Sequence, residues 1–181
     1  GDTSTRTPFT GSIEGQGHTI SNLTINRSST DNVGLFGGMN SSTISNVSFD
    51  DIDVTGNEYT GGLVGRSESS QQAITTVTNV SVNGTVTGTK WVGGLAGGYN
   101  ITVEESQSSA TVDGTENVGG LVGLIYPNNV VTDSHTTGSV NGTHEVGGAV
   151  GFSDGGTVSN VSVTGDTTGT KLLGGIVGYK D

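Results

Sequence analysis

A five-residue phrase recurs through the chain, and its spacing constrains the fold more than any other feature. The phrase has the form Gly-Gly-Leu-Xaa-Gly, with small variations. Its copies end at Gly37, Gly65, Gly97, Gly123, Gly151 and Gly178. Successive copies are therefore 28, 32, 26, 28 and 27 residues apart. A near-constant period is typical of repeat architectures, in which each repeat is one unit that packs on its neighbours.

A second phrase lies about midway between the glycine phrases and reads Thr-Ile-Ser-Asn-Val-Ser-Phe or close variants. Its clear copies begin at Thr19, Thr43, Thr76 and Thr157. The copies around Val103 and Val131 are more polar. A further glycine closes the next stretch of each repeat, at Gly56, Gly88, Gly114, Gly142 and Gly169. Each repeat thus contains three short stretches of β-forming residues, separated by Gly or Asn corners.

Three short strands in each repeat predict an all-β fold, a parallel β-helix (β-solenoid) of about six coils. No segment places apolar residues at the helical spacing of three and four. Strands that rise about 3.3 Å per residue make one triangular coil from each repeat, and successive coils stack at about 4.8 Å. We expect residues 1–181 to form a single domain, with residues 1–32 as the opening coil and residues 33–178 as the repeats.

Equivalent residues of successive coils should lie over one another and fill a narrow core. The first inward column is expected to contain Ile20, Ile44, Val77, Val103, Val131 and Val158. The second should contain Phe36, Val64, Ala96, Val122, Val150 and Val177. The third should contain Val33, Val92, Val118, Val146 and Leu173. A corner ladder of stacked side-chain amides is expected at Asn22, Asn46, Asn79 and Asn160.

Composition agrees with a narrow core and excludes several classes of function. Only 29% of the residues are hydrophobic, whereas 33 are Gly. The formal net charge is −11 with 6 Lys and Arg, so a nucleic-acid partner, which requires clustered basic residues, is not expected. Such an acidic surface also suits high-salt habitats. No apolar run reaches the roughly 18 residues that direct membrane insertion requires. The lack of Cys excludes disulfides and thiolate metal sites.

The glycine phrases resemble those of the GLUG-repeat family of bacterial and archaeal surface β-helix arrays. The segment from Pro8 to Ile20, Pro-Phe-Thr-Gly-Ser-Ile-Glu-Gly-Gln-Gly-His-Thr-Ile, is similar to the stretch that commonly begins such arrays. The resemblance covers nearly the whole chain. It implies a right-handed parallel β-helix within large surface proteins, including adhesins and some immunoglobulin A peptidases. In those peptidases the repeats accompany a metalloprotease domain, but the chain has no His-Glu-Xaa-Xaa-His motif, so that activity is not expected here.

The titratable residues do not predict a catalytic, cofactor-binding or metal site. The three histidines, His18, His135 and His144, stand at unlike registers of different repeats. Asp50, Asp51 and Asp53 form the densest acidic cluster, but their spacing alternates along a strand, whereas a calcium loop needs converging oxygens. We interpret this cluster as a solvated acidic face, with weak calcium binding as the alternative.

Two groups of apolar side chains are candidates for an interaction face. The aromatic group follows the glycine phrases and forms either a ligand strip or the cover of one core corner; it contains Tyr99, Tyr126, Phe152 and Tyr179. The aliphatic group lies inside the phrases and contains Leu35, Leu63, Leu95, Leu121, Ala149 and Ile176. If the strands do not kink at their glycines, the aliphatic group forms an exposed stripe that would mark a lateral contact.

Nine Asn-Xaa-Ser/Thr sequons are present, and four of them lie at expected turns. These four candidates for glycosylation, in a source that glycosylates, are Asn40, Asn83, Asn100 and Asn141.

The sequence therefore predicts a secreted or cell-surface protein with a structural or adhesive role, and not an enzyme. We expect a stalk, an adhesin segment or a filament subunit. Open solenoid ends expose unpaired strand edges, which would be covered by further coils of a longer parent protein or by head-to-tail assembly with a second copy. Surface glycans or receptors on host or other cells are further possible partners. The alternative is a carbohydrate-binding or carbohydrate-cleaving β-helix. An ice-binding face is disfavoured, because the Thr-Xaa-Thr pattern is not repeated in register.

Overall fold

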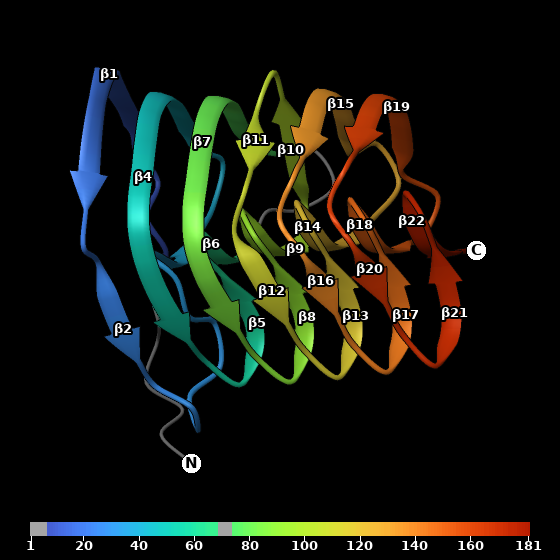
Figure 1. Ribbon diagram of the computed structural model, residues 1–181. Coiled ribbons are helices and arrows are strands. Elements are labelled where there is room, and N and C mark those ends of the chain that lie inside the picture. The colour runs from blue at the N-terminus through green and yellow to red at the C-terminus, as the bar shows by residue number, and fades with distance from the viewer. Residues whose placement is uncertain (1–6, 69–73) are drawn as a thin grey trace.

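The computed structural model describes residues 7–68 and 74–181, and every element in that part of the chain is a β-strand (Figure 1). All strand pairs are parallel and join a strand to its equivalent in the next coil, so the chain winds into a β-solenoid of about six turns. The first and last strands, β1 and β22, lie at opposite ends of the stack (Figure 1). The prediction of a parallel β-solenoid is confirmed. Residues 1–6 of the expected opening coil lie outside the described residues.

The strands form three sheets, one for each side of the coil. The wide sheet has eleven strands, which are β1 (Ser12–Ser21), β2 (Thr24–Asn26), β4 (Thr43–Thr55), β7 (Thr75–Thr87), β10 (Ile101–Glu104), β11 (Gln107–Ser108), β12 (Thr111–Asp113), β15 (Val130–Thr136), β16 (Val140–Asn141), β19 (Thr157–Val163) and β20 (Thr167–Thr168). The five-stranded sheet contains β5 (Glu58–Gly61), β8 (Lys90–Gly93), β13 (Glu116–Gly119), β17 (His144–Gly147) and β21 (Lys171–Gly174). The six-stranded sheet contains β3 (Phe36–Met39), β6 (Val64–Ser67), β9 (Ala96–Tyr99), β14 (Val122–Ile125), β18 (Val150–Ser153) and β22 (Val177–Lys180).

Each coil passes through the wide sheet, the five-stranded sheet and the six-stranded sheet in that order. The chain turns at a glycine between the first two sheets and at the Gly-Leu pair of the glycine phrase between the last two. In the coil that begins with β4, for example, Gly62 and Leu63 separate β5 from β6. The two phrases of the sequence therefore correspond to two different sides of one coil.

The second and third predicted columns are present in the expected register. Val64 pairs with Ala96, and Val122 pairs with both Ala96 and Val150. In the third column Val118 pairs with Val92 and Val146, and all three are buried. The coil between Val33 and Val92 contributes the buried Thr60 to that column, where no apolar residue is available.

The first column differs from the prediction at its first member. Ile13, not Ile20, pairs with Ile44, whereas Ile20 pairs with Phe49 and is 41% exposed. The register of β1 shifts between Glu14 and His18, so the copy of the second phrase that begins at Thr19 lies further along its coil than the other copies.

The predicted corner ladder is confirmed for Asn46, Asn79 and Asn160, and the prediction is wrong for Asn22. All four residues have the left-handed backbone conformation, with φ between 49° and 59°. The Asn79 amide donates to Asn46 Oδ1 at 2.6 Å, and Asn46 Nδ2 donates to Glu14 Oε1 at 2.9 Å. Further along the stack Asn160 Nδ2 donates to Asp133 Oδ1. Asn22 lies at the next corner instead, where its backbone N–H donates to Asp50 O.

The aliphatic residues of the glycine phrases point into the core, so the predicted exposed stripe is wrong. Leu63, Leu95, Leu121 and Ala149 are fully buried, and Leu35 is half-buried against the core. The chain turns at the Gly-Leu pair between two strands, and the leucines at these turns belong to the buried core. Ile176 alone among the six is exposed, because no described coil covers it.

Candidate binding groove

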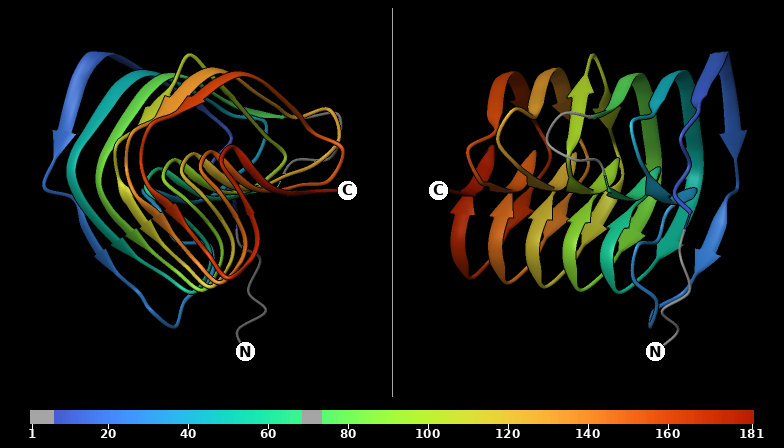
Figure 2. Two further views of the ribbon diagram at one scale, coloured as in Figure 1. Left: turned by 45° about the vertical axis from the view of Figure 1, so that its right-hand side comes forward. Right: turned by 180° about the vertical axis from the view of Figure 1, so that it is seen from behind.

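A groove runs where the five-stranded and six-stranded sheets meet. From the solenoid corner the five-stranded sheet runs inward, and the six-stranded sheet then turns away from it, so the two sheets enclose a concave angle on the outside of the solenoid (Figure 2). Part of this angle is a pocket of about 270 Å³. It is lined by Lys90, Trp91, Glu116, Asn117, Leu124, Tyr126, Glu145, Phe152 and Tyr179.

One wall of the groove carries a column of residues with left-handed backbone conformation. The column contains Tyr59, Trp91, Asn117, Glu145 and Leu172, with φ between 46° and 56°. Each occupies the second position of a strand in the five-stranded sheet. In β8 this conformation interrupts the usual alternation of a strand, so Lys90 and Trp91 both lie at the surface while Val92 points inward. Two successive side chains per coil therefore become available to the groove.

Glycines form the floor on which the two walls meet. A Cβ atom built on Gly123 would lie 2.5 Å from the carbonyl carbon of Trp91, and one on Gly151 would lie 2.4 Å from that of Asn117. Separations below 3.0 Å are not tolerated by real side chains. Only glycine at the last position of the phrase lets the two sheets approach this closely.

Aromatic rings and cations lie along the groove in contact with one another. Tyr59 stacks on Trp91 at a centroid distance of 4.3 Å, and Phe152 stacks on Tyr179 at 5.5 Å. Tyr99 and Tyr126 meet edge to face at 4.9 Å. The Arg66 guanidinium lies 4.7 Å from the Tyr99 ring centroid and 5.2 Å from that of Tyr59. These are cation–π distances.

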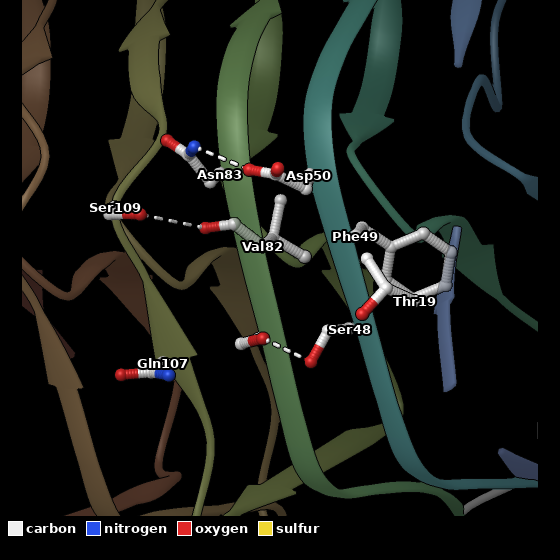
Figure 3. A pocket seen from close by; sticks show the side chains of 9 residues that line it. Thr19, Ser48, Phe49, Asp50, Val82, Asn83, Gln107 and Ser109 are labelled. Atoms are coloured by element: carbon white, nitrogen blue, oxygen red, sulfur yellow. Dashed lines mark hydrogen bonds between the residues drawn. The ribbon is translucent and has the colours of Figure 1, made fainter. Parts of the chain in front are cut away.

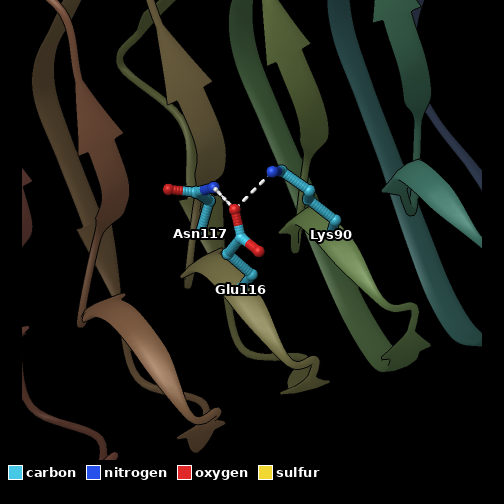
Figure 4. A network of polar contacts seen from close by, with 3 residues as sticks. All are labelled: Lys90, Glu116 and Asn117. Carbon is cyan, nitrogen blue, oxygen red and sulfur yellow. Dashed lines mark hydrogen bonds and ion pairs between the residues drawn. The ribbon is translucent and has the colours of Figure 1, made fainter. Parts of the chain in front are cut away.

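Lys90 forms the ion pair of the groove. Its ammonium group lies 4.4 Å from the Trp91 ring centroid. The same group pairs with Glu116 Oε1 of the next coil (Figure 4). The same carboxylate oxygen accepts a hydrogen bond from Asn117 Nδ2 at 3.3 Å. An aromatic face and a carboxylate thus contact one ammonium group, and an amide donates to that carboxylate.

Two tyrosines near the groove have raised pKa values. Loss of solvent raises the pKa of the Tyr59 and Tyr126 phenols, and the positive charge of Arg66 opposes this shift in both. Both phenols are therefore neutral near pH 7 and present hydroxyl groups rather than negative charge.

The four aromatic residues predicted from the sequence lie on this side of the solenoid. Tyr126, Phe152 and Tyr179 line the pocket, and Tyr99 contacts Tyr126 and Arg66. The sequence prediction missed Tyr59 and Trp91. Both precede a Gly-Gly pair by two positions, and this shared register was a signal that could have found them.

A second, polar hollow of about 400 Å³ lies on the wide sheet (Figure 3). Its side chains bond from coil to coil: Ser81 Oγ donates to Ser48 Oγ at 2.8 Å, and Asn83 Nδ2 donates to Asp50 Oδ1 at 2.8 Å. These groups satisfy one another, as expected of a structural ladder.

The structure separates the three histidines and leaves the aspartates of the acidic cluster exposed. His18 pairs with Val47, His135 with Gln107 and His144 with Glu116, so the three histidines belong to different columns. Asp50, Asp51 and Asp53 are all exposed. Within residues 7–68 and 74–181, no three His, Asp or Glu side chains are grouped so that they could hold a metal ion.

The four sequons singled out from the sequence differ in accessibility. Asn83 is exposed, and Asn40 and Asn141 are half-buried. Asn100 lies at a bend, as expected, but it is only 4% exposed, which disfavours it as a glycosylation site. Asn141 Nδ2 donates to Asp113 Oδ1 at 2.9 Å, and the Asn83 amide is engaged in the ladder described above. A glycan at either residue would replace an inter-coil hydrogen bond.

Comparisons with known proteins relate the chain to a repeat motif, a curated sequence and a solved structure. Residues 56–87 match the model of the GLUG motif. Over 103 residues, 56% of this chain, the sequence is 44% identical to halomucin of Haloquadratum walsbyi (strain DSM 16790 / HBSQ001), of which the match covers 1%. The fold is similar to the crystal structure of a proposed immunoglobulin A1 protease from Bacteroides ovatus, with a TM-score of 0.75 and 20% identity. That likeness covers 91% of this chain and 56% of the other, and at this identity it concerns the fold alone. In the part of the chain that the structure describes, no helix has the length and apolarity needed to cross a membrane.

Proposed function

Since the chain belongs to the GLUG-repeat family and folds as one continuous β-solenoid, we propose that it is a structural segment of a larger extracellular surface protein. In this role it acts as a stalk or adhesin segment that sets the distance between other parts of the surface. The sequence similarity to halomucin over 103 residues supports a location outside the cell.

The observation that carries the proposal is the exposed end of the core columns. Leu173 is 50% exposed, whereas Val146, directly beneath it in the same column, is fully buried. Ile176 is 42% exposed above the fully buried Ala149. A hollow of about 560 Å³ lined by Val161, Val163 and Ile176 lies on the same end. Apolar surface and open strand edges of this kind are stabilised by another coil.

We propose that this end stacks on further coils, either of a longer parent protein or of a second copy in head-to-tail assembly. The columns of the solenoid repeat from coil to coil, so a coil added in register continues all three sheets at once. A structural role rather than catalysis is also proposed, and the mutually satisfied hydrogen bonds of the wide sheet support it.

The location can be tested on intact cells of the source organism. Antibodies raised against the purified chain should label the surface of intact cells. Labelling that appears only after cell lysis would contradict the proposal.

Assembly can be tested on the purified chain by sedimentation velocity and electron microscopy. We expect rods that lengthen with protein concentration. The double substitution Leu173→Glu and Ile176→Glu places charge on the end face and should abolish lengthening. Thr137→Glu, on the exposed side of the solenoid, is the matched control and should not. Uniform short particles at all concentrations would exclude head-to-tail assembly.

A further inference from the structure

The groove holds one ammonium group that belongs to the chain itself. As described above, Lys90 lies over the Trp91 ring and pairs with the Glu116 carboxylate. Arg66 lies between Tyr59 and Tyr99 in a similar way. The surface of this groove is therefore suited to cations at two successive places along the stack.

Further along the stack the same pocket, which Lys90 also lines, contains a second carboxylate and a pair of aromatic rings. Glu145 lines the pocket together with the stacked rings of Phe152 and Tyr179. In the column of residues with left-handed conformation, Glu145 lies one coil after Asn117, and Asn117 lies one coil after Trp91. Among the described residues the Glu145 carboxylate has neither an ion pair nor a hydrogen-bond donor, since the one ion pair there is Lys90–Glu116.

The charged groups nearest in register leave this carboxylate available. His144 precedes Glu145 on the same strand and pairs with Glu116 and Lys171 in the neighbouring coils. Lys171 is exposed, and no ion pair joins it to Glu145. Glu145 itself is half-buried.

We propose that this pocket binds an organic ammonium cation, held between the Glu145 carboxylate and an outer face of the Phe152–Tyr179 ring stack. Alkylated ammonium groups are recognised by aromatic rings, whose faces carry negative potential, and an adjacent carboxylate adds direct charge pairing. The net charge of −11 raises the local concentration of cations around the protein. A neutral sugar could stack on the same rings and donate a hydroxyl to Glu145, but it would lack the direct charge pairing of an ammonium group. This binding role is separate from the structural role proposed above.

Choline and its uncharged isostere 3,3-dimethyl-1-butanol distinguish charge recognition from contact with the rings alone. Binding can be followed by the fluorescence of Trp91, the single Trp of the chain, and by NMR shifts of the Phe152 and Tyr179 rings. We expect choline to bind in a saturable manner and the isostere to bind at least about fivefold more weakly, the effect of one partly exposed charge pair. Added salt should weaken choline binding. N-acetyl-lysine methylamide, tested in parallel, shows whether the source of the ammonium group can be a lysine side chain.

Three substitutions locate the site. Glu145→Gln keeps the size of the side chain and should weaken choline binding about fivefold or more, whereas Glu104→Gln on β10, in another sheet, should leave it unchanged. Lys90→Met removes the chain's own ammonium group and should create a second site of the same kind at Trp91 and Glu116. Circular dichroism confirms that each variant is folded.

Three results would overturn the proposal. Equal affinity for choline and its isostere would show that the charge is not recognised. An unchanged affinity in Glu145→Gln would place any binding elsewhere. Binding of neutral oligosaccharides without binding of either ammonium compound would assign the groove to glycans instead.

Discussion

A Cβ atom built on Gly97 would lie 2.6 Å from the carbonyl carbon of Tyr59, which belongs to the preceding coil. The nearest backbone atoms around it also include the Gly65 oxygen at 2.4 Å and the Thr60 nitrogen at 2.7 Å. None of these atoms belongs to a flexible side chain that could move aside. The glycine phrase therefore reflects contact between two sheets at their backbones, on the outer side of the solenoid.

The glycines of the phrase should differ in their tolerance of a methyl group. In Gly148→Ala the added Cβ would meet Gly175 O at 2.2 Å and Val163 Cγ1 at 2.5 Å. We expect a loss of about 2 kcal/mol or more in the free energy of unfolding, measured by urea denaturation. Gly175 occupies the same position one coil later, with no heavy atom within 4 Å of its Cβ, and Gly175→Ala is the matched control. Equal losses at the two sites would contradict the inter-coil contact.

The inward leucines should be the most costly to truncate. Leu95 is fully buried, so Leu95→Ala leaves a cavity and should lower the free energy of unfolding by about 2–5 kcal/mol. Leu172→Ala removes the same atoms from a side chain that is 50% exposed and should change it by less than about 0.5 kcal/mol. Thermal unfolding followed by circular dichroism distinguishes the two. A small effect at Leu95 would restore the interpretation of these leucines as an outward stripe.

The corner asparagines combine a backbone and a side-chain role, and two substitutions at Asn79 separate them. Its φ of 53° favours Asn or Gly over other residues. Asn79→Ala should cost about 1–2 kcal/mol through both strain and the lost bond to Asn46, whereas Asn79→Gly loses only the bond and should cost about 1 kcal/mol. Chemical denaturation measures both. If the glycine variant were the less stable one, the left-handed conformation would not be the cause.

The stability of the solenoid should fall in acid because two carboxylates are stabilised in the folded state. The Gln16 backbone N–H, with Asn46 and Ser45, lowers the pKa of Glu14; the Asn160 amide and the Thr132 hydroxyl lower that of Asp133. Folded-state pKa values below the unfolded ones contribute stability above about pH 4, and it is lost as the pH falls through the lowered values.

The double variant Glu14→Gln and Asp133→Asn cannot titrate at these positions. Its melting temperature should therefore decline less steeply than that of the unmodified chain between about pH 5 and pH 2. Asp166→Asn, at an exposed carboxylate away from both contacts, is the control. Parallel declines in all three proteins would show that other groups dominate the acid response.

The sequence predicts the coil and most of its columns because stacking requires the same kind of residue at the same place in each repeat. It is less informative where a strand gains or loses a residue. In β1 the left-handed residues Gln16 and Gly17 accompany the register shift between Glu14 and His18. Ile20 and Ile44 occupy the same position in their copies of the second phrase, yet Ile20 lies further along its coil. A repeated sequence phrase cannot reveal such a shift in register. The register is set by which residues of neighbouring strands are hydrogen-bonded to each other.

The groove could not be predicted from the sequence, for a different reason. Alternation predicts which side a residue faces only while a strand stays regular, and the residues at Tyr59, Trp91 and Glu145 interrupt it. The concave angle between the two small sheets depends on backbone contact at glycines, which have no side chain to signal a surface. The four aromatic residues predicted from the sequence form one part of the groove. The column of residues with left-handed conformation forms the other wall.

The strands of the six-stranded sheet are all four residues long, from β3 to β22, while the segments that lead from this sheet back to the wide sheet differ in length. Duplication of one coil within a gene would thus insert a unit whose upper and lower surfaces already match its neighbours. Extension by whole coils requires no change to the interior of the existing coils. The length of such a protein can therefore evolve independently of its stability. Every added coil also lengthens the groove by one step.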